Sequence, residues 1–268
     1  MTTVGKALAA SVLPPLEARA LLASLCGVAR ETLIAFPERA LDESVRQAFE
    51  AACARRTAGE PLAYLVGEKE FFGLSFRVNR DVLIPRPETE LLVEVALALM
   101  QGRRPPRVLD LGTGSGCIAV TLALRIPGAT VTAVDRSAAA LVVAHGNADR
   151  HGASLRFVRS DWFSAVSGQF DLIVGNPPYV AAGDPHLDAL RFEPTVALTD
   201  DADGLSCLRR IANAAPAFLA PEGWLVVEHG HDQGQAVRDL FTAAGLHDVQ
   251  TQRDLAGIAR VCRGRRAQ

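Results

Sequence analysis

The pattern of hydrophobic and polar positions divides the chain into a helical first part and a second part in which strands alternate with helices. Leu16–Cys26 places its leucines close to one helical face, and Gly27 follows where such a helix would end. Ser44–Thr57 has the composition of a second helix. Further along, short apolar runs alternate with helical stretches, which is typical of a parallel sheet with crossover helices.

Seven apolar, β-rich runs are candidate strands of this sheet. They are Arg107–Asp110, Thr130–Asp135, Leu155–Arg159, Leu172–Gly175, Trp224–Glu228, Asp248–Gln252 and Ile258–Cys262. The last two are separated by too few residues for a crossover helix. We therefore expect them to pair antiparallel, as a hairpin.

A short connecting segment lies between the two parts. Phe71–Asn79 has a central glycine flanked by aromatic and β-branched residues, which predicts a hairpin. Pro85 and Pro87 then interrupt the chain before a helix that we expect from about Glu88 to Met100. The chain is thus divided into a helical domain over residues 1–70, a hairpin and linker over 71–87, and an α/β domain over 88–268.

The charge of the chain is close to balanced. It has 28 basic and 30 acidic residues, with 10 against 9 in residues 1–80 and 18 against 21 in the rest. Attraction of the whole molecule to a nucleic-acid backbone is therefore not expected. Near the C-terminus four arginines cluster, and we interpret them as a solvated tail rather than a binding patch: Arg260, Arg263, Arg265 and Arg266.

Cysteine usage and hydropathy indicate the compartment. The five cysteines are scattered, odd in number and never spaced C-x-x-C, which favours small buried residues in a reducing compartment over disulfides or zinc ligands. They are Cys26, Cys53, Cys117, Cys207 and Cys262. The chain shows neither a leader pattern nor an apolar run long enough for a membrane helix. We expect a cytoplasmic protein that does not enter the membrane.

A glycine-rich turn follows the first strand of the α/β part. Asp110 to Cys117 reads Asp-Leu-Gly-Thr-Gly-Ser-Gly-Cys and runs into an apolar helix. Glycines at such a turn let a ligand approach the backbone. The third glycine, Gly116, comes one position earlier than a dinucleotide-binding fingerprint requires, and no phosphate-loop Lys-Ser/Thr pair follows. The turn alone leaves the ligand open.

The ends of the next two strands narrow the choice of ligand. Asp135 ends the second strand, where an acid can accept hydrogen bonds from ribose hydroxyls. Asp161 and Trp162 follow the third strand, where the indole can form an apolar wall for adenine. Asp135 could instead be a helix N-cap and Trp162 a core residue. Their occurrence at successive strand ends of one sheet favours a nucleoside ligand.

The fourth strand ends in Asn176-Pro177-Pro178-Tyr179. The two prolines fix their φ angles and donate no hydrogen bond, so the local carbonyls are rigid acceptors, and Asn176 adds a side-chain carbonyl. Together these groups can hold both hydrogens of an NH₂ group on a planar system, over which Tyr179 can pack. Such a nitrogen is a poor nucleophile because its lone pair is delocalised, so fixing its position favours its reaction.

This segment resembles that of methyltransferases acting on exocyclic or amide nitrogens, including the adenine-N6 enzymes of DNA and RNA. A wider set of motifs is similar to the release-factor glutamine methyltransferases, the HemK family, over nearly the whole chain. The motifs are Gly59-Glu60-Pro61-Leu62-Ala63-Tyr64, Phe71-Phe72-Gly73-Leu74, Leu83-Ile84-Pro85-Arg86-Pro87-Glu88-Thr89-Glu90, Glu193-Pro194, Asp203-Gly204-Leu205, and Asp254-Leu255-Ala256-Gly257 with Arg260.

The resemblance implies a Rossmann-like class I methyltransferase fold, with a seven-stranded, mostly parallel sheet, a C-terminal antiparallel hairpin and a helical N-terminal domain that recognises the substrate. It implies methyl transfer from S-adenosylmethionine, giving S-adenosylhomocysteine, to the glutamine amide in the Gly-Gly-Gln motif of class 1 peptide chain release factors. No metal and no nucleic-acid substrate are implied.

The same resemblance assigns roles to residues. Those implied to contact S-adenosylmethionine are Gly112, Thr113, Gly114, Ser115, Gly116, Asp135, Trp162 and Asn176. Asn176, Pro177, Pro178 and Tyr179 are implied to hold the glutamine, with Asn176, Pro177 and Tyr179 catalytic. One departure is His229, where the family more often has an aliphatic residue, and we interpret it as tolerated variation in the wall of the site. His229 and His231, without a third ligand nearby, are too few for a metal site.

Two alternatives stay open from the residues alone. An adenine methyltransferase of nucleic acid would share the glycine-rich turn and the Asn-Pro-Pro-Tyr segment, but would need a basic surface for its target. A non-catalytic S-adenosylmethionine-binding module associated with the ribosome or with termination, whose cofactor site would be vestigial, is the second alternative. The near-neutral first part disfavours the former, and the complete set of site residues disfavours the latter.

Overall fold

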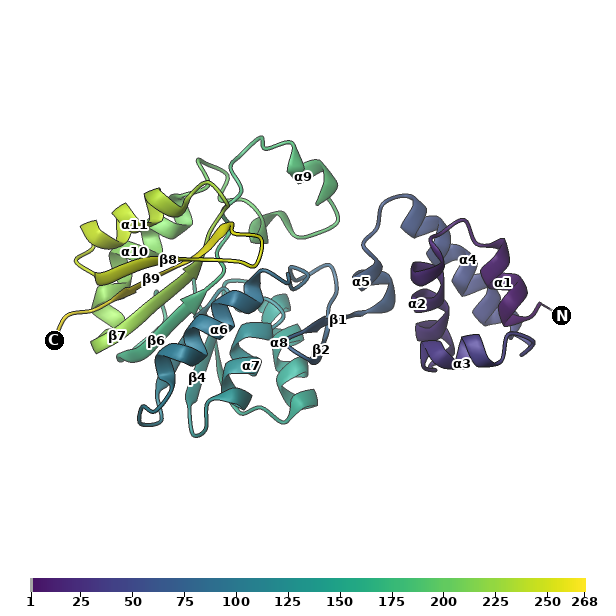
Figure 1. Cartoon of the computed structure of the whole chain (residues 1–268), viewed down its shortest axis with the longest axis horizontal. Coiled ribbons are helices and arrows are strands. Elements are labelled where there is room, and N and C mark those ends of the chain that lie inside the picture. The colour runs from purple at the N-terminus through teal and green to yellow at the C-terminus, as the bar shows by residue number, and fades with distance from the viewer. Residues whose placement is uncertain (1) are drawn as a thin grey trace. The chain divides into compact units, whose positions relative to one another are not determined.

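The computed structural model describes residues 2–268 (Figure 1). The chain forms two compact units that divide after Glu68. Because each unit has its own hydrophobic core, they are described separately.

The first unit consists of helices: α1 (Val4–Ala10), α2 (Pro15–Cys26), α3 (Arg30–Ala35), α4 (Glu43–Thr57) and α5 (Leu62–Val66). The two helices expected from periodicity are confirmed as α2 and α4. Leu21 and Leu22 of α2 pack with Phe49 of α4 at the centre of the core. The other three helices have seven residues or fewer, too short to show a periodic pattern.

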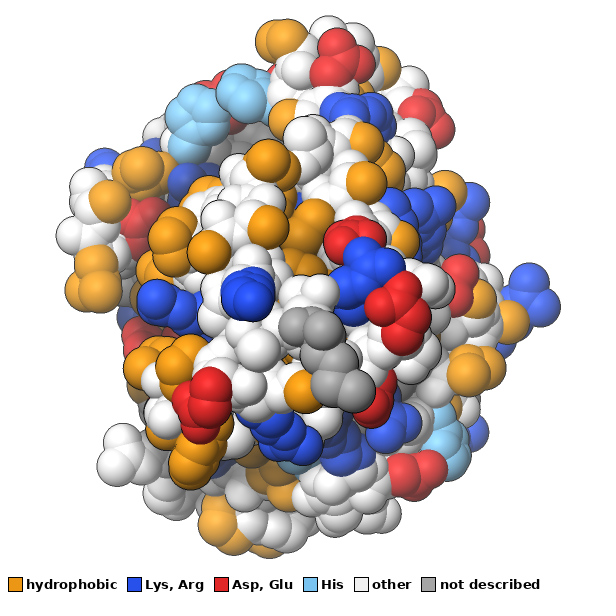
Figure 2. Space-filling model, turned by 90° about the vertical axis from the view of Figure 1, so that its right-hand side faces the viewer, with side chains coloured by type: hydrophobic (Ala, Val, Ile, Leu, Met, Phe, Trp, Pro, Cys, Tyr) orange, Lys and Arg blue, Asp and Glu red, His pale blue; other side chains and the backbone are white. Residues whose placement is uncertain are grey.

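Polar contacts also shape this unit. Glu60 is buried, and its carboxylate accepts two hydrogen bonds from Arg55, each of 2.7 Å. Several large apolar side chains remain exposed, among them Leu16 and Phe36. Figure 2 looks from the right-hand side of Figure 1 and shows hydrophobic side chains scattered among basic and acidic ones.

The hairpin expected over Phe71–Asn79 is present but starts earlier: β1 (Glu68–Phe71) and β2 (Leu74–Arg77) lie at the start of the second unit and turn at Phe72 and Gly73. Asn147 of α8 (Ala138–His151) ties this hairpin to the glycine-rich turn. Its side-chain oxygen accepts from the Arg77 N–H at 2.8 Å, and its nitrogen donates to the carbonyls of Arg77 at 3.0 Å and Ser115 at 2.8 Å. The hairpin therefore supports the turn from behind.

A seven-stranded sheet forms the body of this unit, in the order β5-β4-β3-β6-β7-β9-β8. Its strands are β3 (Arg107–Leu111), β4 (Thr130–Asp135), β5 (Leu155–Arg159), β6 (Phe170–Gly175), β7 (Leu219–Glu228), β8 (His247–Arg253) and β9 (Ala259–Arg265). All seven expected strands are confirmed. Strands β3 to β7 are parallel, and β9 pairs antiparallel with both β7 and β8, as the short link between the last two strands requires.

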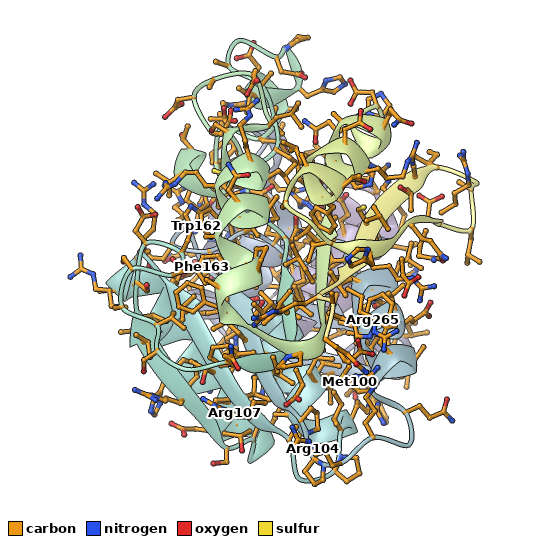
Figure 3. The ribbon with its side chains drawn as sticks, turned by 90° about the vertical axis from the view of Figure 1, so that its left-hand side faces the viewer. Met100, Arg104, Arg107, Trp162, Phe163 and Arg265 are labelled. Atoms are coloured by element: carbon orange, nitrogen blue, oxygen red, sulfur yellow. The ribbon has the colours of Figure 1, made fainter. Side chains whose placement is uncertain are left out.

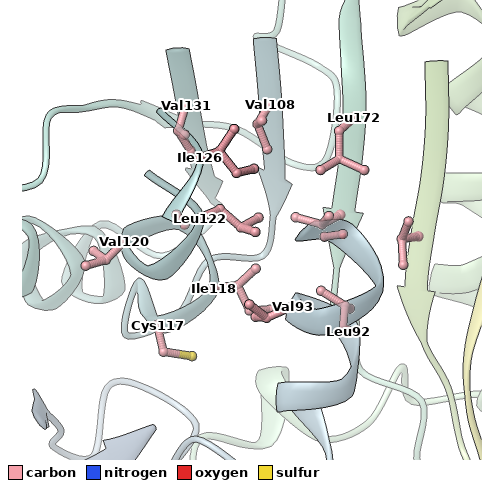
Figure 4. Close-up of a cluster of buried hydrophobic side chains, with 14 of the residues drawn as sticks. Leu92, Val93, Val108, Cys117, Ile118, Val120, Leu122, Ile126, Val131 and Leu172 are labelled. Atoms are coloured by element: carbon pink, nitrogen blue, oxygen red, sulfur yellow. The ribbon is translucent and has the colours of Figure 1, made fainter. Parts of the chain in front are cut away.

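Helices cover both faces of the sheet, because alternate residues of the buried strands are apolar on each side. On one face, α6 (Thr89–Met100) and α7 (Cys117–Arg125) pack through Leu92 and Ile118 against Val108 and Leu172, with α8 beside them (Figure 4). On the other face lie α10 (Ser206–Phe218) and α11 (Gly234–Ala243). A loop with two short helices, α9 (His186–Ala189) and the 3-10 turn Thr195–Ala197, follows β6.

The C-terminal arginines are not the solvated tail that their clustering suggested. Strand β9 inserts between β7 and β8, so Arg263 and Arg265 lie on an inner strand and stack on the ring of Trp224. Arg265 also pairs with Glu222, and Arg266 donates to the carbonyl of Leu219. Local composition cannot show this insertion, because it is a contact between strands distant in sequence.

Candidate functional site

A cavity of about 240 Å³ lies at the carboxyl ends of the parallel strands, where open α/β sheets bind their ligands. It is lined by residues that follow four neighbouring strands. Figure 3 shows Trp162 at the opposite end of the sheet from Arg104 and Arg107, which mark the start of β3. Of the expected site residues, the cavity brings together Gly112, Thr113, Gly114, Ser115, Asp135, Trp162, Asn176 and Pro178. Three other expected site residues do not line the cavity: Gly116, Pro177 and Tyr179.

The glycine-rich turn needs its glycines for two physical reasons. Gly112, Gly114 and Gly116 all have positive φ, which side chains disfavour. A Cβ on Gly116 would also lie 3.1 Å from the Ala144 side chain, which is tighter than an ordinary contact, whereas one on Gly112 would meet the Trp162 indole at an ordinary 3.5 Å. The turn therefore lies close to Trp162 on one side and to α8 on the other.

Asp135 at the end of β4 organises the backbone around this turn. Its Oδ2 accepts a hydrogen bond from the Gly114 N–H and its Oδ1 accepts one from the Ser137 N–H, both at 2.9 Å. Each carboxylate oxygen has a second lone pair, so both can still accept from a ligand hydroxyl. The carboxylate faces the cavity with its position fixed.

Trp162 and Asp161 form the wall beyond β5. Trp162 has a positive φ of 52°, a conformation that costs free energy in a non-glycine residue and places the ring over Gly112. Asp161 is exposed and forms an ion pair of 2.7 Å with Arg210 of α10. These two side chains close the rim of the cavity between β5 and α10.

Asp110 is a buried acid that the sequence analysis quoted without assigning a role. It is fully buried beneath the turn, and its Oδ2 accepts from the Thr113 hydroxyl at 2.6 Å. Burial raises its pKa to about 7, the Thr113 hydrogen bond opposes the shift, and its Oδ1 has no hydrogen-bond partner among the described residues. In the sequence, its position in a strand did not distinguish it from a residue with a purely structural role.

The Asn176 side chain is held from one end only. Its Nδ2 donates to the hydroxyl of Thr89, the first residue of α6, at 3.1 Å. Its Oδ1 is buried and, within the described part of the chain, has no hydrogen-bond partner. Gly175 makes this geometry possible, because a Cβ there would lie 3.0 Å from the Leu111 carbonyl oxygen. A buried acceptor without a donor is unfavourable unless a ligand supplies one.

Tyr179 is anchored by its hydroxyl. That group donates to Glu228 Oε1 at 3.1 Å, and the residue packs against the second core cluster of the sheet. Burial, followed by the neighbouring charge of Glu228, raises the pKa of Tyr179, so the phenol stays protonated. The structure thus fixes the phenol, while the expected packing of its ring on a substrate remains a prediction.

Glu228 ends β7 and is buried beside these residues. Burial raises its pKa to about 7, while the hydroxyls of Thr89 and Tyr179 and the charge of Arg260 act in the opposite direction. Glu88, just before α6, adds a small upward effect. Neither Glu228 nor Thr89 had an expected role from the sequence. Thr89 lies inside one motif of the resemblance, and Glu228 directly precedes the departure at His229. These positions were the only signal of their importance in the sequence.

The loop after Tyr179 is held in place by two further residues without an expected role. Glu193 is buried and accepts hydrogen bonds from the Ile84 N–H, at 3.0 Å, and from Arg86. Gln233 donates to the carbonyls of Tyr179, at 3.0 Å, and Gly204, at 3.1 Å. A Cβ on Gly204 would lie 2.5 Å from the Tyr179 carbonyl oxygen, which explains a glycine there.

His229 does not occupy the wall of the cavity, where we expected it. It is fully buried on the α11 side, with its Nδ1 2.8 Å from the Gly230 carbonyl oxygen and its ring against Gly234. Burial lowers its pKa, which favours the neutral ring. Residues 2–268 contain no cluster of three or more His, Cys, Asp or Glu side chains with the geometry of a metal site. All five cysteines are free thiols.

Two family models match the chain: "Methyltransferase small domain" over residues 87–192 and "PrmC N-terminal domain" over residues 3–67. A release factor glutamine methyltransferase of Bordetella pertussis is 53% identical over 98% of this chain and 99% of its own length. One of Burkholderia pseudomallei is 52% identical over 98% and 96%.

A solved methyltransferase from Pyrococcus furiosus has the same fold as this chain. The two superpose with a TM-score of 0.57 at 19% identity, covering 80% of this chain and 98% of that one. Over residues 2–268 no helix is both long and apolar enough to cross a membrane.

Proposed function

The chain belongs to the release factor glutamine methyltransferase family, and we propose that it transfers a methyl group from S-adenosylmethionine to the glutamine side-chain amide in the Gly-Gly-Gln motif of class 1 release factors. The observation that carries this proposal is Asn176 Oδ1, a buried acceptor beside the cavity without a donor of its own. A glutamine amide would supply the missing N–H.

The cavity suits S-adenosylmethionine. Asp135 offers two oriented carboxylate oxygens to ribose hydroxyls, Trp162 offers a flat apolar wall to adenine, and the glycine-rich turn lets the ligand approach the backbone. When bound, the cofactor supplies a methyl group on a positively charged sulfur. The glycine-rich turn, Asp135 and Trp162 would hold the cofactor, and its methyl group would replace one N–H hydrogen of the glutamine amide.

The chain's own residues supply position rather than acid–base chemistry. We assign Asn176 Oδ1 and the Pro177 carbonyl as the two acceptors for the glutamine NH₂ hydrogens. Pro178 borders the cavity and Tyr179 stiffens the segment through Glu228. Holding both hydrogens places the nitrogen lone pair toward the methyl carbon, and such positioning accounts for much of the rate of a bimolecular transfer.

The first unit has a separate task in this proposal. It holds the release factor, and its exposed apolar side chains provide surface for a protein partner: Val12, Leu16, Ile34 and Phe36. The near balance of 10 basic and 9 acidic residues in residues 1–80 suits a protein better than a nucleic-acid backbone.

A methyl-transfer assay with tritiated cofactor tests the function against its nearest rival. We expect label on a class 1 release factor and none on adenine in RNA or DNA. Label on adenine alone would establish the rival. A protein that fails to bind S-adenosylmethionine in calorimetry would instead be a non-catalytic module with a vestigial cofactor site.

A further inference from the structure

Thr89 holds the asparagine of the site at one end. It is 2% exposed, and its hydroxyl accepts from Asn176 Nδ2 at 3.1 Å. The two side chains come from the start of α6 and from the segment after β6. They meet only because the sheet brings these elements together.

The orientation of the Asn176 amide decides what the site can bind. The two ends of an asparagine amide have nearly the same size, but one accepts hydrogen bonds and the other donates them. If the amide were turned over, its NH₂ group would take the place of Oδ1. It would then meet the NH₂ group of a glutamine, and two donors cannot pair. The site therefore needs a group that holds one orientation.

The Thr89 hydroxyl supplies this preference. Its oxygen accepts the N–H of Asn176 Nδ2, which keeps the NH₂ end of the amide against the start of α6. Asn176 Oδ1 is left at the other end, buried and without a donor among the residues described.

We propose that Thr89 is a positioning residue that holds the Asn176 amide with its oxygen available to the substrate NH₂ group. The inference rests on the proposed function, since it concerns how the same asparagine grips its substrate. It adds a residue outside the Asn-Pro-Pro-Tyr segment to the determinants of the reaction. Thr89 also lines the cavity, and the inference is that its effect on the reaction passes through Asn176.

A double-mutant cycle tests whether Thr89 acts through Asn176. The four proteins are the wild type, Thr89→Val, Asn176→Ala and the double variant, assayed on a release factor with full-length enzyme. Valine keeps the shape of threonine and removes its hydroxyl. We expect Thr89→Val to lower kcat by roughly 10- to 100-fold, with little change in KM for the release factor or in Kd for the cofactor. In the Asn176→Ala background, the same substitution should cause no further loss.

Thr89→Ser is the matched control, because it keeps the hydroxyl and should retain most of the wild-type kcat. Thermal unfolding of each variant checks that it folds, and Thr89→Ala replaces Thr89→Val in the cycle if valine is not tolerated. Losses that multiply in the double variant, a serine variant as impaired as the valine one, or a valine variant with wild-type kcat would each overturn the inference. A wild-type protein that leaves release factors unmethylated would instead refute the proposed function, and this inference with it.

Discussion

The two halves of the cavity satisfy their polar groups in different ways. At the ends of β3 and β4, both oxygens of Asp135 already accept backbone N–H groups, which fixes the glycine-rich turn. Just after β6, the Asn176 amide is held by its nitrogen while its oxygen, among the described residues, stays without a donor. The first half is thus shaped by its own backbone, whereas the second keeps an acceptor free. This difference matches a site that binds a cofactor in one half and grips a reacting amide in the other.

Removing the free acceptor should have the largest effect. Asn176→Ala deletes one of the two groups that position the reacting nitrogen, and we expect kcat to fall by roughly 100- to 1,000-fold, as for the loss of one oriented polar group in other active sites. Single-turnover kinetics with a release factor measures this. Asn213→Ala, at an exposed position of α10, is the control and should behave as wild type. Near-normal turnover of Asn176→Ala would contradict its assigned role.

Removing the carboxylate of the other half should act on binding. Asp135→Ala loses the acceptors proposed for the ribose, and the Gly114 and Ser137 N–H groups lose theirs. We expect Kd for S-adenosylmethionine to rise by about 10- to 100-fold, with a smaller change in kcat. Calorimetry measures it.

Asp161→Ala is the matched control for this prediction. Asp161 lines the same cavity but is exposed and paired with Arg210, so its loss should change Kd little. If both variants weakened cofactor binding equally, the proposed contact between Asp135 and the ribose would be refuted.

A pH series tests the buried carboxylate of Glu228, which anchors Tyr179. The pKa of Glu228 is raised from its ordinary 4.5 to about 7 by burial, so the folded protein holds this proton more tightly than the unfolded chain. Its contribution to stability is therefore complete below pH 4.5 and is lost as the pH rises through 7. Relative to Glu228→Gln, the wild type should lose roughly 3 kcal/mol of unfolding free energy over this window.

Denaturant unfolding at several pH values measures that difference. Glu94→Gln, at an exposed position of α6, should run parallel to the wild type. The buried Asp110, whose pKa is also raised to about 7, is present in every one of these proteins and cancels in the comparison. A constant gap between wild type and Glu228→Gln across the window would mean that Glu228 titrates normally.

The strands and the glycine-rich turn could be predicted because their signals are local. Alternation of strand and helix located all seven strands, and position at a strand's end singled out Asp135 and Asn176. Thr89 and Glu228 could not be assigned in this way, because each gains its role from Asn176 or Tyr179, which lie 87 and 49 residues away in sequence. The same reason explains the error on the C-terminal arginines, since only the fold shows β9 between β7 and β8.

The position of the transferred methyl group tests the central claim most directly. After reaction of the wild-type protein with a class 1 release factor and S-adenosylmethionine, fragmentation mass spectrometry of the Gly-Gly-Gln peptide should show one added CH₂ unit on the glutamine side chain. The Asn176→Ala reaction should leave that peptide almost unmodified. An unmodified glutamine in the wild-type reaction, or a methyl group on another residue, would contradict the account.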